Sequence, residues 1–319
     1  MILYERGHFL LNDRLSKFLP EFKEPQILVE LDTLENGIIT EPSKKEIRII
    51  DLLTHSSGIS YPFIKNDLQQ IYRDAGIIDG LTAKDMVLKN QMAKLAEQPL
   101  LFEPGSKYHY GLSTDLLGYL CEVISGKPLD RFFSEEIFTP LKMHDTHFYL
   151  PEDKQQRLVI LYSWQDAEGL VVSKGDESSI IMDNPNYPVE GAKRYFSGGA
   201  GLSSTVYDYA RFIQMLLNDG ELEGARIISR KSVELMRRGR VDSNDDGIAE
   251  IGLGFFVIND IAQFGEVGSD GAYAWGGAFY TSYWIDPAES LIGVFMSQAR
   301  PAKTNIGNKF RTLVYQALE

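Results

Sequence analysis

The 319-residue sequence contains one cysteine, Cys121, so it cannot form a disulfide bond within the chain. It has no apolar run near the roughly 18 residues that a membrane-spanning helix requires. Basic residues are in the minority, since 32 Lys and Arg stand against 45 Asp and Glu, a formal net charge of -13. We therefore expect neither a membrane span nor a nucleic-acid partner, because nucleic-acid phosphates require a basic surface.

Residues that would indicate a metal or a cofactor are few. His144 and His147 are close in sequence, but they fall in a predicted turn and no third ligand is evident. The glycine-rich segment 197–205 resembles a phosphate cradle, yet it lacks the lysine of a P-loop and the spacing of a dinucleotide fingerprint. We interpret it as a tight loop followed by a helix cap, and we expect neither a metal nor a cofactor.

The first two thirds of the sequence have mainly helical patterning. The clearest helix is predicted over Thr114–Ser125, where apolar residues recur with helical spacing and Gly126 follows as a cap. A second helix is predicted over Thr205–Asn218. Segment 150–195 is rich in Asp, Asn and Pro, and we interpret it as a long irregular excursion. Further helical segments are predicted at residues 1–6, 47–58 and 82–96.

The C-terminal third is richer in aromatic and β-branched residues. Strands are predicted at Leu253–Ile258, Phe279–Ile285 and Leu291–Ser297. A helix over Thr304–Leu318 is predicted to close the sheet. The sequence thus predicts an α+β fold in one domain over residues 1–319, with a helical region at about 20–240 and the sheet with its C-terminal helix at about 250–319.

Three segments carry residue types suited to catalysis. Tyr110 precedes a helix start, whose positive end favours an ionised phenol that could relay a proton; the alternative is a buried structural tyrosine. Trp275-Gly276-Gly277 is predicted to open a strand, where glycines allow close backbone approach at an oxyanion hole or mark a β-bulge. The segment 52–58 places a histidine beside serines, and we interpret it as a helix end, because a triad is assembled from distant segments.

The order of these segments resembles one known family. Segment 52–58, then Pro104-Gly105 with Tyr110, then 198–205, then Trp275–Gly277 before a predicted hairpin resembles the class C β-lactamase and penicillin-binding-protein family of serine hydrolases, including its esterase branch. The resemblance implies a β-lactamase/transpeptidase-like fold and a small-molecule acyl substrate. It also implies that a serine in a Ser-x-x-Lys motif attacks the acyl carbonyl and forms an acyl-enzyme.

The resemblance assigns roles to particular residues. Tyr110 corresponds to the catalytic tyrosine, Trp275–Gly277 to the Lys-Thr-Gly strand, and the Ala278 amide to one oxyanion donor. Leu112 stands where β-lactamases have a substrate-binding asparagine, and Trp275 stands in place of the lysine. We expect Leu112, Trp275, Gly276 and Gly277 to bind substrate. Since both replacements are apolar, small acyl esters are expected as substrates rather than β-lactams.

One element of the family pattern is missing. No serine in the sequence has a lysine three residues later. In the family the Ser-x-x-Lys helix directly precedes the segment that matches residues 1–7, which indicates a helix end capped by Gly7. We expect Met1 to be an internal methionine of a longer protein, with the N-terminal helix and strands missing; a nucleophile-free relative is the alternative.

These observations leave several functions open. We expect a carboxylesterase or transesterase in the complete protein and an inactive chain as written. A non-catalytic binding or regulatory module is the main alternative, and a β-lactamase or D-amino-acid peptidase is a further one.

Overall fold

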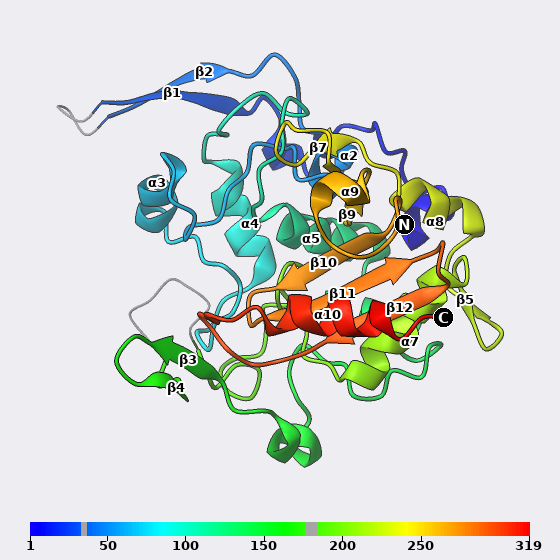
Figure 1. Cartoon of the computed structure of the whole chain (residues 1–319). Coiled ribbons are helices and arrows are strands. Elements are labelled where there is room, and N and C mark those ends of the chain that lie inside the picture. Colours follow the sequence, from blue (N-terminus) through cyan, green and yellow to red (C-terminus); the bar gives the residue numbers. More distant parts are fainter. Residues whose placement is uncertain (33–36, 176–183) are drawn as a thin grey trace. The chain divides into compact units, whose positions relative to one another are not determined.

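The computed structural model describes residues 1–32, 37–175 and 184–319 (Figure 1). Its contacts divide the chain into two compact units. Unit 1 comprises Met1–Phe132 and Asp176–Leu202, and unit 2 comprises Phe133–Gly175 and Ser203–Glu319. Each unit is described by itself, and the single domain expected from the sequence stays a prediction. Within the described residues, no helix is both long and apolar enough to cross a membrane.

The central helix of unit 1 is α5, Ser113–Ser125, as predicted from its apolar spacing. Leu116 and Leu120 are buried on it, and Gly126 ends it in a left-handed conformation with φ 68°. Helices α1, α2 and α4 pack against α5. The helical and strand elements of unit 1 are α1 Ile2–Glu5, the 3-10 turns Leu15–Lys17 and Pro20–Phe22, β1 Gln26–Asp32, β2 Gly37–Pro42, α2 Ile49–Leu53, α3 Leu68–Asp74 and α4 Leu88–Ala96.

Helix α4 begins later than residue 82, where the sequence predicted its start. The Lys84 amide donates to the Thr82 hydroxyl at 3.0 Å, and the Met86 amide donates to the Lys84 carbonyl. These local hydrogen bonds form turns that compete with helix formation at residues 82–87. Strands β1 and β2 pair antiparallel, and β1 agrees with a strand suggested by the sequence near Ile27–Leu31.

Among the described residues of unit 2, six strands form an antiparallel sheet in the order β12-β11-β10-β9-β8-β7. The strands are β7 Val241–Asp242, β8 Ala249–Ile251, β9 Phe256–Ile258, β10 Tyr273–Gly277, β11 Thr281–Asp286 and β12 Leu291–Phe295. The antiparallel sheet in the C-terminal third confirms the α+β prediction. Strands β7 and β8 precede the predicted strands in the chain and were not predicted.

Two helices cover opposite faces of this sheet, because successive side chains of a strand point to opposite sides (Figure 1). Tyr283 of β11 packs against Tyr209 of α7, Val206–Leu217, at a ring-centroid distance of 5.1 Å. The next residue, Trp284, packs against Phe310 of α10, Ile306–Gln316, at 6.0 Å. Both helices confirm their sequence predictions.

Two predicted strand starts were wrong. Phe279 lies in the turn that joins β10 to β11, so β11 starts at Thr281 and the two glycines end β10 instead of opening a strand. Gly254 has φ 85° in a tight turn that delays β9 to Phe256. The geometry of a turn determines where the neighbouring strand begins or ends, and the periodicity of side chains gives no information about that geometry.

The segment 150–195 is less irregular than predicted. It contains a 3-10 turn at Glu152–Arg157 and the hairpin β3 Tyr162–Gln165 with β4 Gly169–Val172. Residues 176–183 of this segment lie outside the described part of the chain. Helix α6, Leu129–Phe133, spans the end of the first segment of unit 1. The remaining elements of unit 2 are the π-turn Ser134–Phe138, β5 Glu221–Leu222, β6 Ala225–Arg226, α8 Arg230–Met236 and α9 Ile261–Phe264.

Candidate active site

The loop that carries Tyr110 is fastened to segment 52–58 of unit 1. The Gly105 amide donates to the Ser56 carbonyl at 2.7 Å, and the His109 amide donates to the His55 carbonyl at 2.7 Å. Gly105 has φ 80°, which explains the glycine in the predicted Pro-Gly turn. These bonds hold Tyr110 just ahead of the first turn of α5, where the helix dipole is positive.

The ring of Tyr110 lies between two buried aromatic side chains. Its centroid is 4.8 Å from that of His55 and 5.2 Å from that of Tyr61. Burial, with a smaller contribution from His109, lowers the pKa of His55 to about 3, so this imidazole is neutral at pH 7. His55 therefore places no positive charge beside Tyr110.

The serines near His55 serve local structure, as the sequence predicted. The Thr54 hydroxyl donates to the Ile50 carbonyl at 2.9 Å, within the end of α2. Ser57 Oγ lies 2.9 Å from Ser113 Oγ, the first residue of α5, which joins the two helices. Both serines are fully buried.

Leu112 occupies the N-cap position of α5 and is fully buried. Its amide donates to the Ser60 carbonyl at 3.3 Å. The side chain therefore belongs to the packing of unit 1 around Tyr110, and its expected contact with a substrate stays a prediction.

The second group of predicted residues lies at the end of β10 in unit 2. The ladder between β10 and β9 stops at Ala274, whereas the ladder with β11 continues to Gly277. Gly276, Gly277 and Ala278 are exposed. A Cβ at Gly277 would lie 2.1 Å from Thr281 Oγ1, so a larger residue there would require the Thr281 side chain to move. The exposed strand end is what an oxyanion donor from backbone amides requires.

Trp275 lies on the α7 face of the sheet, because it pairs in register with Tyr283. Tyr283 in turn packs against Tyr209. Burial raises the pKa of Tyr209 to about 12 and raises the pKa of Tyr283 as well, so both stay neutral phenols at pH 7. These three aromatic residues supply an apolar face beside the exposed end of β10.

The predicted site residues thus form two groups. Tyr110 and Leu112 belong to unit 1, with His55 and Tyr61 around the tyrosine. Trp275–Ala278 belong to unit 2. Sequence reasoning missed Tyr61 and Asp115, which lie near Tyr110; the polar Ser113-Thr114-Asp115 run directly after it was the available signal.

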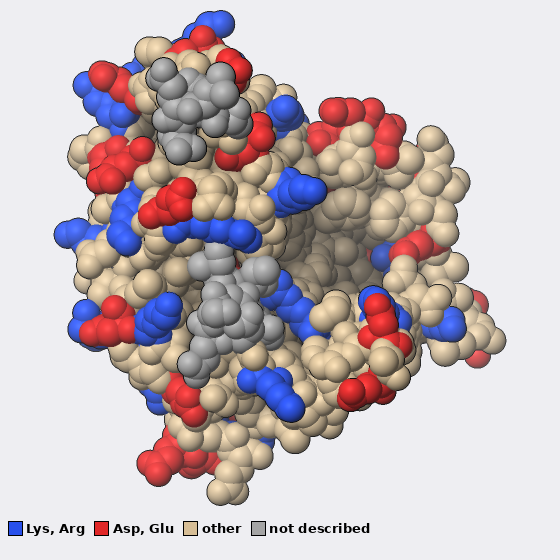
Figure 2. Space-filling model, turned by 90° about the vertical axis from the view of Figure 1, so that its left-hand side faces the viewer, with Lys and Arg blue, Asp and Glu red and all other residues tan. Residues whose placement is uncertain are grey.

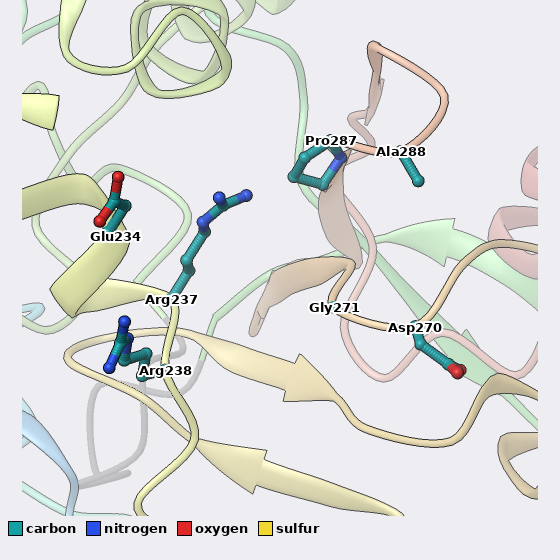
Figure 3. A pocket seen from close by; sticks show the side chains of 7 residues that line it. All are labelled: Glu234, Arg237, Arg238, Asp270, Gly271, Pro287 and Ala288. Atoms are coloured by element: carbon teal, nitrogen blue, oxygen red, sulfur yellow. The ribbon is translucent and has the colours of Figure 1, made fainter. Parts of the chain in front are cut away.

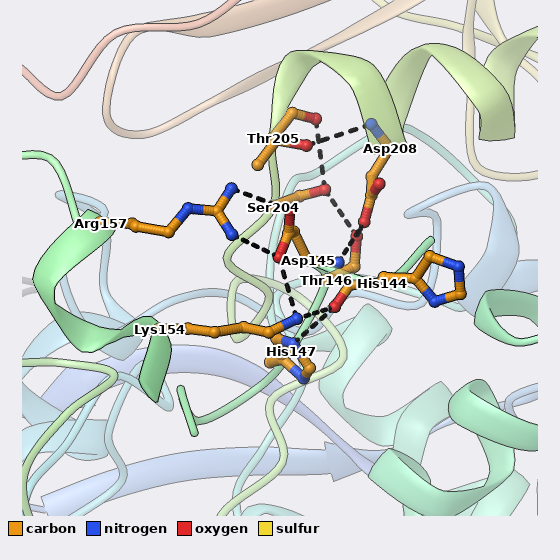
Figure 4. Close-up of polar contacts among 9 residues, drawn as sticks. All are labelled: His144, Asp145, Thr146, His147, Lys154, Arg157, Ser204, Thr205 and Asp208. Atoms are coloured by element: carbon orange, nitrogen blue, oxygen red, sulfur yellow. Dashed lines mark hydrogen bonds and ion pairs between the residues drawn. The ribbon is translucent and has the colours of Figure 1, made fainter. Parts of the chain in front are cut away.

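The two histidines considered as metal ligands take part in a different network (Figure 4). The His147 ring nitrogen Nε2 lies 3.1 Å from the His144 carbonyl, and the His144 ring points away from it. Asp145 between them pairs with Arg157 and Lys154 at 2.7 and 2.9 Å, which holds the pKa of its carboxyl well below the usual range. The arrangement braces this loop of unit 2.

Segment 197–205 forms a tight loop and a helix cap, as predicted. The Ala200 amide donates to Ser197 Oγ at 3.1 Å, and the Gly201 amide donates to the Ser197 carbonyl at 3.0 Å. Thr205 caps α7 by accepting the Asp208 amide at 3.2 Å. The glycines also permit close contact with α5, because a Cβ on Gly198 would overlap the Thr114 carbonyl.

A cavity of about 380 Å³ lies elsewhere in unit 2 and contains none of the predicted site residues (Figure 3). Its wall consists of Glu234, Arg237, Arg238, Asp270, Gly271, Pro287 and Ala288. The two arginine side chains point in different directions, so they do not converge on one anion. On the face in Figure 2, charged side chains of both signs are interspersed.

Comparison with known proteins gives consistent matches over nearly the whole chain. The sequence model of the beta-lactamase family matches residues 1–316. Protein Rv1367c of Mycobacterium tuberculosis is 31% identical over 94% of this chain and 74% of its own length. Esterase EstB of Burkholderia gladioli is 28% identical over 91% of this chain and 71% of its own length. The structure of EstCE1, described as a hydrolase with promiscuous acyltransferase activity, has a TM-score of 0.80 and 24% identity over 99% of this chain and 79% of its own.

Proposed function

Because the chain belongs to the β-lactamase family of hydrolases and acyl-transfer proteins, we propose that it is the major part of a carboxylesterase or transesterase for small acyl esters. The observation that carries the proposal is that the chain has both motifs in the family's order: unit 1 holds Tyr110 just ahead of α5, and unit 2 holds Trp275-Gly276-Gly277 at the exposed end of β10. EstB is named an esterase, and EstCE1 is described as a hydrolase with acyltransferase activity.

The proposed reaction is acyl transfer through a serine. A serine hydroxyl of a Ser-x-x-Lys segment attacks the ester carbonyl, and its proton passes to the ionised oxygen of Tyr110, which the lysine helps to keep ionised. The carbonyl oxygen becomes an oxyanion, which the Ala278 amide stabilises by hydrogen bonding. Loss of the alcohol, which takes up the proton, leaves an acyl-enzyme. Water or a second alcohol then releases the acyl group.

Ester substrates fit the residues better than β-lactams. A carboxylate-bearing amide would need polar anchors, but Leu112 and Trp275 are apolar. Trp275, Tyr283 and Tyr209 instead offer aromatic surface with neutral hydroxyls. Such a wall favours a small uncharged acyl or alcohol group.

A non-catalytic binding module is the second candidate, and one observation favours it. No serine of the 319-residue sequence has a lysine three residues later. A relative that kept Tyr110 and the end of β10 but lost the nucleophile would bind acyl compounds without turning them over.

Covalent labelling separates the two functions. A fluorophosphonate probe is added to the chain and to the protein isolated from its native source, and the coding DNA upstream of Met1 is read for an in-frame Ser-x-x-Lys. We expect label on the native protein and faster hydrolysis of p-nitrophenyl acetate than of a chromogenic cephalosporin. Absence of label on folded native protein would establish the binding module instead; cephalosporin hydrolysis at the ester rate would contradict the substrate class.

A further inference from the structure

A cluster of buried polar groups in unit 1 includes Tyr61, whose ring contacts that of Tyr110. Tyr61 Oη, Asp115 Oδ2 and Thr114 Oγ1 surround the Cα of Gly199: a Cβ built there would lie 2.5, 2.6 and 2.8 Å from them. Tyr61 and Asp115 are fully buried, and the Thr114 hydroxyl is also shielded from solvent. Only a glycine at 199 leaves room for the three oxygens to converge.

These oxygens are poorly satisfied for buried groups. Among the described residues, no partner completes a hydrogen bond of good geometry to Tyr61 Oη, Thr114 Oγ1 or either Asp115 oxygen. Ser197 and the Gly199 amide lie near enough to Asp115 to lower its pKa, but burial outweighs them and raises the pKa to about 7, with Asp79 adding to the rise. A buried carboxylate without firm donors destabilises the fold, so packing alone does not account for it.

Asp208 in unit 2 shows what a structural aspartate does at the same helix position. Asp115 and Asp208 are each the third residue after the N-cap of their helix, α5 and α7. Asp208 Oδ2 accepts the Asp145 amide at 2.7 Å and the Thr146 hydroxyl at 3.0 Å. For Asp115 the donors are the Ser197 side chain and the Gly199 amide, and its carboxyl shares the space around Gly199 with the Tyr61 hydroxyl.

The neighbour that links the cluster to the candidate site is Tyr61. Its ring packs against Tyr110 at 5.2 Å and stacks on Phe63 at 4.7 Å, which fixes its direction. Burial, then the charge of Asp115, then Tyr110 raise the pKa of Tyr61, with a hydroxyl contact to Tyr110 contributing. Tyr61 therefore keeps its proton and can donate it as a hydrogen bond to the Tyr110 oxygen.

We propose that Tyr61 and Asp115, with Thr114, position Tyr110 and determine which of the two phenols keeps its proton. This inference rests on the proposed function, in which Tyr110 moves a proton. A phenol that receives a hydrogen bond from Tyr61 ionises at lower pH, because donation stabilises its phenolate form, so a larger fraction of it can accept a proton near neutral pH. Asp115 and Tyr61 are thus positioning residues, which act on substrate only through Tyr110.

The test measures the ionisation of Tyr110 directly and needs no nucleophile. The full chain is labelled with [13Cζ]tyrosine, and its spectra are recorded between about pH 6 and 12. Tyr61→Phe and Tyr110→Phe assign the two signals. We expect Tyr61→Phe to raise the ionisation midpoint of Tyr110 and Asp115→Asn to lower it, each by about one pH unit, since the first removes a donor and the second a nearby negative charge.

Asp208→Asn is the matched control, because it alters an aspartate at the same helix position in unit 2. It should leave the Tyr110 midpoint unchanged. If Asp115→Asn does not fold by far-ultraviolet circular dichroism, Thr114→Val replaces it, with a smaller expected shift in the Tyr110 midpoint. An unchanged midpoint in both Tyr61→Phe and the folded cluster variant would overturn the proposal. Absence of fluorophosphonate label would count against the proposed function alone.

Discussion

At the scale of single residues, Asp115 couples the stability of the fold to pH. Its folded pKa of about 7 lies above the value near 3.9 expected in an unfolded chain. Between these values the folded state binds more protons than the unfolded state, so this carboxyl lowers stability as pH rises, by at most about 1.4 kcal/mol per pH unit. At lower pH the penalty disappears.

We therefore expect the free energy of unfolding of wild type to fall between about pH 4 and 7 relative to that of Asp115→Asn. Urea denaturation at the two ends of this range measures the difference. The asparagine cannot ionise, so its relative advantage should be largest at pH 7 and above. Parallel pH profiles for the two proteins would show that Asp115 ionises with the same pKa in both states.

Tyr110 can be compared with a close neighbour. In the fluorophosphonate-reactive protein, Tyr110→Phe is expected to lower kcat for p-nitrophenyl acetate by about 100-fold or more, because it removes the proton-transfer group. Tyr108→Phe is the matched control; its ring lies 6.3 Å from His55, and burial raises its pKa to about 12. Equal losses in both variants would mean that only packing was disturbed.

At the scale of elements, helix α10 is joined to the sheet by a partly buried hydrogen bond. The Tyr315 hydroxyl donates to Asp286 Oδ2 at 2.7 Å, at the end of β11. Asp286 is fully buried and also accepts the Ala288 and Glu289 amides. The bond therefore joins the helix to the turn between β11 and β12.

Tyr315→Phe should destabilise the chain by about 1–3 kcal/mol, because it removes a donor from a buried carboxylate. The free energy of unfolding in urea measures this loss. Tyr207→Phe on α7 is the control, since that side chain is 68% exposed and should change stability little. A loss below that of Tyr207→Phe would show that the bond contributes nothing to stability.

The helices and strands also show which parts of the fold could be predicted from the sequence. Helices α5, α7 and α10 were predicted within two residues at each end, because their apolar periodicity and caps are local signals. The hairpin β3–β4 was missed, and the start of α4 was placed six residues early. Both depend on hydrogen bonds in turns, which cannot be predicted from amino-acid composition.

At the scale of the whole molecule, the three tryptophans provide a test of domain organisation. Trp164, Trp275 and Trp284 all lie in unit 2, so tryptophan fluorescence reports only that unit. Far-ultraviolet circular dichroism also reports the helices of unit 1. We predict that thermal unfolding followed by the two methods gives one coincident transition, as for a single domain. Separate midpoints would mean that the units unfold independently.

The sequence by itself determined the α+β class, the principal helices, the family and the candidate residues Tyr110 and Trp275–Ala278, because these depend on local periodicity, turn chemistry and motif order. Only the tertiary structure decided that Gly277 ends a strand at an exposed edge. It also brought Tyr61, Asp115 and Gly199 together behind Tyr110. These residues come from distant segments, and their convergence depends on burial and close packing that no local pattern encodes.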